Sequence, residues 1–175
     1  SDVYKRQAIK LIKYIMAEQT KVKTLEKVVI RFSGDSGDGM QLTGTIFSNL
    51  SAVFGNEIST FPDYPAEVRA PQGTLSGVSG FQVHLGSRKI FTPGDKADVL
   101  VAMNPAALKV NVNHLKPNAI VLIDTDSFKK SDLEKALFTT DDPFTELGLT
   151  GVQVVAAPIS TMVKDGLVEF GLGNK

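Results

Sequence analysis

The 175-residue sequence contains no cysteine and only two histidines, His84 and His114. Without cysteine, the chain cannot form a disulfide framework, a thiolate nucleophile, a Cys-ligated zinc site or a cysteine-held iron–sulfur cluster. A His-rich metal site is not expected either. Long apolar runs are also lacking: runs such as Ala119–Ile123 are far shorter than the ~20 residues that cross a bilayer. We therefore expect a cytoplasmic protein with no membrane partner.

An excess of either charge is also absent, because 19 Lys and Arg balance 19 Asp and Glu. Neutralising nucleic-acid phosphates requires a basic surplus, so no nucleic-acid partner is expected. The length fits one hydrophobic core. Residues 1–27 hold seven basic and three acidic residues, and no cap precedes the helical spacing of Ala8–Ile15. We expect residues 1–15 to be an N-terminal extension and a candidate for non-native sequence, with residues 16–175 forming the domain.

Strand and helix patterns alternate from Lys27 onward. Short β-branched or alternating runs predict strands at Val28–Phe32, Glu57–Phe61, Val78–Leu85, Lys89–Thr92, Asp98–Met103, Ala119–Asp124 and Val152–Ala156. Helical spacing and caps predict helices at Met40–Phe54, Pro105–His114, Ser131–Leu137, Phe144–Leu147 and Pro158–Gly171. This alternation predicts an α/β fold, with a three-layer, mostly parallel, Rossmann-like sheet and helices on both faces.

The fold class indicates where a ligand would bind, because open α/β sheets bind ligands beyond the C-terminal ends of their strands. In this chain the predicted ends carry Ser33–Gly39, Asn104, Asp124–Asp126 and Pro158–Ser160. The Pro62–Gly77 loop is unusually long for a compact domain, which is typical of a functional loop. We expect it to fold over the same edge.

The glycine-rich loop Gly34–Gly39 (Gly-Asp-Ser-Gly-Asp-Gly) is the main chemical candidate. It lacks the order of a dinucleotide fingerprint, and its two aspartates would repel a phosphate unless a cation intervened. The aspartate spacing does not fit a calcium loop. Gly37-Asp38-Gly39 is similar to the opening of a thiamine-diphosphate metal motif, but the later Asn-Asn of that motif is missing. A purely structural turn, in which Asp and Ser side chains cap helix N–H groups, remains an alternative.

A serine hydrolase is the enzymatic alternative. Phe32–Ser36 resembles the nucleophile block of the esterases named for their Gly-Asp-Ser-Leu motif, with Ser36 as the nucleophile. Such a serine needs a histidine base that a carboxylate positions. The nearest match to the Asp-x-x-His of those esterases is Asn111-x-x-His114, in the middle of the chain, and His84 falls in a strand pattern.

Two smaller patterns also carry charge. Asp124-Thr125-Asp126 follows a strand and resembles a phosphatase nucleophile pair, but the glycine and threonine that usually follow are absent, which favours a capping or turn role. Arg69 is the only arginine in the long loop, and Glu67 lies two residues before it. Arg69 therefore has two interpretations: it binds an anion bidentately, or it pairs with Glu67.

Two segments are distinctive in combination: Val29–Met40, which contains the glycine-rich loop, and Phe61–Pro71, which contains Pro-Ala-Glu-Val-Arg. They resemble the gamma domain of 2-oxoacid:ferredoxin oxidoreductases. The similarity is greater to the alpha subunit of the 2-oxoglutarate type, in which the gamma domain opens a longer fused chain. It continues through Gly73–Gly80, Ala97–Leu108 and Ala119–Phe128 and covers roughly Met16–Lys175. The sequence thus resembles a fragment whose gamma domain is truncated at the C-terminus.

The resemblance implies a reaction in which a 2-oxoacid, coenzyme A and oxidised ferredoxin give acyl-CoA, CO2 and reduced ferredoxin. The complete enzyme uses thiamine diphosphate with Mg and iron–sulfur clusters. In the family these groups are bound outside the gamma domain. We therefore expect this chain to bind no cofactor alone, to hold no catalytic residue or metal ligand, and to be inactive in isolation. The implied partners are the remaining domains of the same subunit, the beta subunit and, through the complex, ferredoxin.

In the family the gamma domain helps to shape the coenzyme A side of the shared cavity. Transferred to this sequence, the resemblance implies that the glycine-rich loop and Glu67–Ser76 face that site. The candidate cofactor-binding residues are Gly34, Asp35, Ser36, Gly37, Asp38, Gly39, Glu67, Arg69, Thr74 and Ser76. Many relatives have an acid-poor loop at this point, so Asp35 and Asp38 depart from the family pattern.

Overall fold

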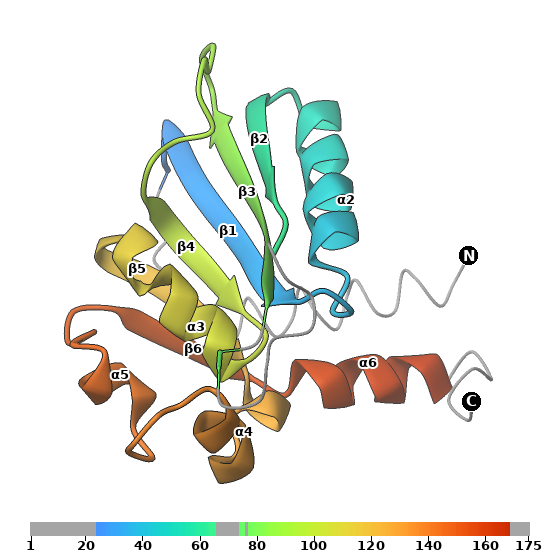
Figure 1. Cartoon of the computed structure of the whole chain (residues 1–175). Helices are drawn as coiled ribbons and strands as arrows, with labels where there is room; N and C mark the ends of the chain where they lie inside the picture. The colour runs from blue at the N-terminus through green and yellow to red at the C-terminus, as the bar shows by residue number, and fades with distance from the viewer. Residues whose placement is uncertain (1–23, 66–73, 76, 169–175) are drawn as a thin grey trace.

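The computed structural model describes residues 24–65, 74–75 and 77–168, and the predicted extension 1–15 lies outside them (Figure 1). In this part of the chain six strands form one sheet in the order β2-β3-β1-β4-β5-β6. The strands are β1 (Lys27–Asp35), β2 (Glu57–Asp63), β3 (Val78–Gly86), β4 (Ala97–Ala102), β5 (Leu115–Asp124) and β6 (Gln153–Ala157). Strand β3 is antiparallel to both of its neighbours, β1 and β2. The pairs β1–β4, β4–β5 and β5–β6 are parallel. The predicted mostly parallel sheet is confirmed.

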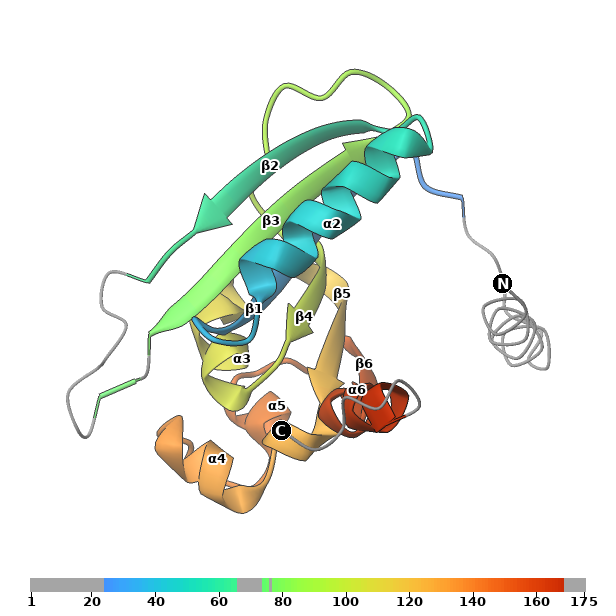
Figure 2. The ribbon, with the colours of Figure 1, turned by 90° about the vertical axis from the view of Figure 1, so that its right-hand side faces the viewer.

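Helices lie on both faces of this sheet, as expected. They are α2 (Met40–Val53), α3 (Pro105–Asn111), α4 (Lys130–Lys135), α5 (Pro143–Glu146) and α6 (Ile159–Val168), with 3-10 turns η1 (Val112–His114) and η2 (Thr125–Ser127). Helix α2 packs on β1, β2 and β3, while α3 packs on β1, β3 and β4 from the other side (Figure 2). The three-layer α/β architecture is therefore confirmed.

Each face of the sheet has its own core, because successive strand residues point to opposite faces. On the α3 side, Leu100, Leu108 and Val121 are fully buried in one cluster. On the α2 side, Phe32 and Phe81 pack with Met40 and Val83 in a second cluster. The sheet is thus covered on both sides near β1 and β3.

Helix α2 has the predicted extent, but its buried face is a different one. The apolar residues whose spacing predicts the helix are exposed: Leu42 is 65% exposed and Val53 is 82% exposed. The helix instead buries Met40, Gly44, Ser48 and Ser51. Small residues permit a close approach between the helix and the sheet, and the apolar stripe therefore points outward.

The predicted strand at Lys89–Thr92 is wrong, because the chain from Ser87 to Lys96 forms a loop. The carbonyls at the end of this loop bind side chains of β3 rather than another strand. Gln82 Nε2 donates to Pro93 O at 2.9 Å, and His84 Nδ1 lies 2.7 Å from Thr92 O. Proline also has no N–H for a strand ladder. The antiparallel partners of β3 are instead β1 and β2.

The predicted helix Pro105–His114 ends at Asn111 and continues as the η1 turn. Strand β5 begins at Leu115, four residues earlier than predicted, with an irregular register between Ala97 and Val99 of its neighbour β4. No helix in the described ranges is long and apolar enough to cross a membrane.

Candidate functional site

The C-terminal ends of β1, β4 and β5 meet at one edge of the sheet, as predicted. A cavity of about 490 Å³ opens there. Its lining comes from the glycine-rich loop, from the start of α3, from the segment between β5 and α4, and from α4 itself. It includes Asp35, Asp38, Asn104, Asp126, Lys129 and Lys135. The topology thus brings three predicted site segments to one polar cavity.

The glycine-rich loop is closed by its own residues. Asp38 N donates to Asp35 O at 3.0 Å, and Asp35 N donates to the Asp38 carboxylate at 2.7 Å. Gly39, at φ 71°, occupies the N-cap of α2 in the left-handed region that favours glycine. No side chain caps this helix, so the predicted capping role of the loop's Asp and Ser side chains is wrong.

Asn104 joins this loop to the next strand. Its Nδ2 donates to Asp35 Oδ1 at 2.9 Å, and its Oδ1 accepts from Ala107 N at 2.8 Å. Asn104 is therefore the N-cap of α3, with Pro105 as the first helical residue, as predicted. Met103 N also donates to Ser33 O at 2.9 Å. These hydrogen bonds fix the distance between the C-terminal ends of β1 and β4.

The electrostatics of the cavity are set by carboxylates close together. Burial raises the pKa of Asp38, and the nearby Asp35 and Asp124 charges raise it further, although the Asp35 N–H bond opposes them. Lys129 and Lys135 also line the cavity on the α4 side. An anionic group placed directly on the glycine-rich loop would be repelled by Asp35 and Asp38. This surface is therefore better suited to a ligand's hydrogen-bond donors than to its anionic groups.

Asp124 organises the β5 and β6 ends. Its carboxylate accepts from Ser160 Oγ at 2.6 Å, and also from Ser160 N, Asp126 N and Ser127 Oγ. Burial opposes ionisation of Asp124, but these donors together hold its pKa below the ordinary value. The predicted capping or turn role of this aspartate pair is confirmed, since Asp126 in turn accepts from Thr161 N at 2.7 Å.

Behind this edge lies a buried polar cluster that the sequence interpretation missed. Arg31 is only 7% exposed and contacts Asp63, Asn111 and Gln82. Asn111 Nδ2 donates to Ser33 Oγ at 2.8 Å. The only signal in the sequence is one arginine inside the apolar run of the first strand, where a buried charge needs partners.

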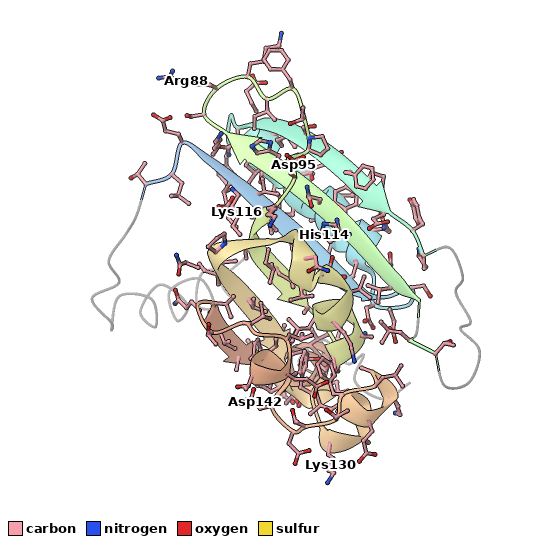
Figure 3. All side chains as sticks on the ribbon, turned by 60° about the vertical axis from the view of Figure 1, so that its left-hand side comes forward. Arg88, Asp95, His114, Lys116, Lys130 and Asp142 are labelled. Atoms are coloured by element: carbon pink, nitrogen blue, oxygen red, sulfur yellow. The ribbon has the colours of Figure 1, made fainter. Side chains whose placement is uncertain are left out.

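The structure does not support a Ser36 hydrolase. His84 pairs with Val29 at the opposite end of β1. A strand rises about 3.3 Å per residue, which puts this histidine roughly 20 Å from the glycine-rich loop. His114 directly precedes the start of β5, also at the opposite edge. Figure 3 shows Arg88, on the loop after β3, and Lys130 of α4 at opposite ends of the molecule.

Part of the predicted site lies outside the described residues. Glu67, Arg69 and Ser76 belong to that part, so the anion-binding and ion-pair interpretations of Arg69 stay predictions. Thr74 is described and exposed. In the described ranges no three His, Cys, Asp or Glu side chains are placed to hold a metal ion. With no cysteine in the sequence, the chain offers no thiolate ligand for an iron–sulfur cluster.

Comparison with known proteins defines the class. The profile of the family described as pyruvate ferredoxin/flavodoxin oxidoreductase matches residues 29–174. The chain therefore belongs to this oxidoreductase family. It is 47% identical over 151 residues to the 2-oxoglutarate oxidoreductase subunit KorA of Mycobacterium tuberculosis. That match covers 86% of this chain and 23% of the relative.

Solved structures agree on the fold. The 2-oxoglutarate:ferredoxin oxidoreductase of Magnetococcus marinus, solved with 2-oxoglutarate, coenzyme A and succinyl-CoA bound, superposes with a TM-score of 0.61 at 26% identity, over 81% of this chain and 22% of that one. A keto/oxoacid ferredoxin oxidoreductase gamma subunit from Geobacter sulfurreducens gives 0.57 at 20% identity, over 81% of this chain and 66% of that one. The chain thus spans less than a quarter of the KorA subunit and of the Magnetococcus marinus chain.

Proposed function

We propose that this chain is the gamma-domain portion of a 2-oxoglutarate:ferredoxin oxidoreductase, which converts 2-oxoglutarate, coenzyme A and oxidised ferredoxin to succinyl-CoA, CO2 and reduced ferredoxin. The observation that carries this proposal is the 47% identity to the KorA subunit. Because the chain covers 23% of that relative, the thiamine diphosphate, magnesium and iron–sulfur groups would be held by the rest of the assembly. The isolated chain would be inactive.

In this proposal the edge around the glycine-rich loop forms part of the wall on the coenzyme A side. The Asp35 and Asp38 carboxylates favour the amide N–H groups of the pantetheine arm over the phosphates, since only donors complement a carboxylate. The phosphates would then require cationic groups, for which Arg69 in the segment Glu67–Ser76 is the candidate. The chain supplies shape and hydrogen bonds to this wall, and no catalytic group.

The partners follow from the same assignment. The remaining domains of the subunit and a beta subunit would complete the cavity, and ferredoxin would receive the electrons through the complex. The relatives' names support an assembly of this kind, since one is a subunit KorA and another a gamma subunit. The cytoplasmic location expected from the sequence stays a prediction.

The proposal is tested in the complete subunit assembled with its partners. The wild-type assembly should reduce ferredoxin only when both 2-oxoglutarate and coenzyme A are present. Asn104→Ala, which frees Asp35 and uncaps α3, should raise KM for coenzyme A about threefold to tenfold, the equivalent of one hydrogen bond, with little change in kcat. Asn113→Ala, exposed at the opposite edge, is the matched control. Activity without coenzyme A, or an unchanged KM in Asn104→Ala, would refute the proposed role of this edge.

A further inference from the structure

Gln41 connects three elements at the candidate site. It is the second residue of α2, two positions after Gly39 at the end of the glycine-rich loop. Its Nε2 lies 2.7 Å from Gly80 O, 3.1 Å from Ser79 Oγ and 3.2 Å from Asp63 O. Asp63 and Gly80 face each other across the β2–β3 pair. One amide group therefore binds the end of β2 and the beginning of β3 together.

The same strand end is also held through its side chain. The Asp63 carboxylate pairs with the Arg31 guanidinium, which is anchored by Asn111 and Gln82. Asn111 is fully buried and Gln82 is 4% exposed, so this support is rigid. The Asp63 backbone is thus fixed by α2 and its side chain by β1.

Gln41 is poorly explained as a residue selected for stability alone. Its amide offers two N–H donors to three acceptors, and its buried Oε1 has no hydrogen-bond partner among the described residues. Buried polar groups are nearly always paired, and an unpaired acceptor has a free-energy cost. The neighbouring positions Met40 and Gly44 already pack α2 against the sheet. The contacts of Gln41 Nε2 with β2 and β3, rather than packing, therefore indicate a positional role.

We infer that Gln41 is a positioning residue for the coenzyme A side of the enzyme. It fixes the exit of the glycine-rich loop relative to Asp63 at the end of β2 and Gly80 in β3, and so holds the loop side of the proposed wall in place against this strand pair. This inference rests on the proposed function. The feature that matters is donation of N–H groups to the carbonyls of Asp63 and Gly80.

Three substitutions separate donation from shape in the assembled enzyme. Gln41→Leu preserves the approximate volume and removes all donors, and Gln41→Glu replaces the donors by acceptors. Both should raise KM for coenzyme A about tenfold, the factor for one lost hydrogen bond, with kcat and KM for 2-oxoglutarate within about twofold. Gln41→Lys supplies three N–H donors to the three acceptors and should keep KM for coenzyme A near the wild-type value.

Matched variants decide between the outcomes. Asn49→Ala changes an exposed residue of the same helix and should leave every kinetic constant unchanged. Asp63→Asn removes the Arg31 ion pair at a 43% exposed side chain but leaves the Gln41 contacts to backbone carbonyls, and should raise KM for coenzyme A more weakly. If Gln41→Leu fails to assemble, Gln41→Glu serves as the test. If Asn104→Ala raises KM while Gln41→Leu and Gln41→Glu do not, the inference is wrong and the proposed function stands. Equal losses in Gln41→Lys and Gln41→Leu would also overturn it. If Asn104→Ala has no effect either, the proposed coenzyme A role of this edge fails.

Discussion

The two halves of the sheet are stabilised in different ways. In the half formed by β2, β3 and β1, buried polar side chains such as Arg31 and Gln82 bind several elements at once. In the half formed by β4, β5 and β6, aliphatic residues such as Leu100 and Val121 form the core. Hydrogen-bonded networks fix geometry, whereas aliphatic packing tolerates change. The polar half is therefore the one suited to positioning a site.

The halves also differ in the apolar surface that they expose. On the aliphatic half, Ile120 and Val155 on one face of β5 and β6 are 37% and 39% exposed. On the polar half, the outward stripe of α2, which packs on β1, β2 and β3, exposes Leu42 and Val53. Contiguous apolar surface, where it is exposed, is typical of an interaction site. The difference teaches that the exposed apolar side chains lie on the sheet itself in the aliphatic half and on the covering helix in the polar half.

The largest effect on stability is expected when the polar half loses Arg31, its buried cation. Arg31→Ala leaves the buried acceptors of Asn111 and Gln82 unpaired and removes the Asp63 ion pair. The free energy of unfolding should fall by about 3 kcal/mol, as when one partner of a buried pair is lost. Urea unfolding measures it. Arg88→Ala, on the loop after β3, is the matched control and should stay within about 0.5 kcal/mol. A loss of unfolding free energy below about 1 kcal/mol would contradict the stabilising role assigned to the Arg31 network.

A smaller effect is expected where α2 approaches the sheet. A Cβ on Gly44 would lie 2.2 Å from Phe81 Cδ1, so Gly44→Val forces the helix away from β3. Overpacking of this kind should cost about 2 kcal/mol in urea unfolding. Gly166→Ala in α6, where a Cβ meets nothing within 4 Å, should be neutral or slightly stabilising. Equal costs at the two glycines would contradict the close approach.

The sequence predicts the parallel half more accurately than the polar half. The runs Asp98–Met103 and Ala119–Asp124 are apolar and β-branched, so their strands, and the site edge where they end, follow from local pattern. The pairing of β3 with β1 and β2 does not, because it depends on contacts between residues distant in sequence. The positional role of Gln41 was invisible for the same reason. The stripe of α2 was misleading, since amphipathic spacing shows that a helix has an apolar face but not what covers it.

Asp124, at the C-terminal edge of the aliphatic half, should show a pH-dependent effect. Its pKa is lowered in the folded state by hydrogen bonds from Ser160, Asp126 and Ser127 despite its burial. A carboxyl with a lowered folded pKa contributes stability above its unfolded pKa, about 3.9, and loses it as pH falls through the folded pKa. Asp124→Asn should cost about 1.5 kcal/mol at pH 7, and the difference from wild type should shrink on acidification. Asp165→Asn, exposed on α6, is the control for urea unfolding across pH. A difference that grows toward low pH would reverse the assigned sign.

The smallest effect is expected on the exposed face of the aliphatic half. Val155→Thr adds a hydroxyl at a side chain that solvent already reaches, so the free energy of unfolding of this chain should change by less than about 0.5 kcal/mol. Val121→Thr makes the same exchange at a fully buried position and should cost several times more, because the hydroxyl loses water without gaining a partner. If β6 is covered by other polypeptide in the complete enzyme, Val155→Thr should weaken assembly while leaving the isolated chain intact. Equal costs for the two valines in urea unfolding would show that the exposed face is already covered within this chain.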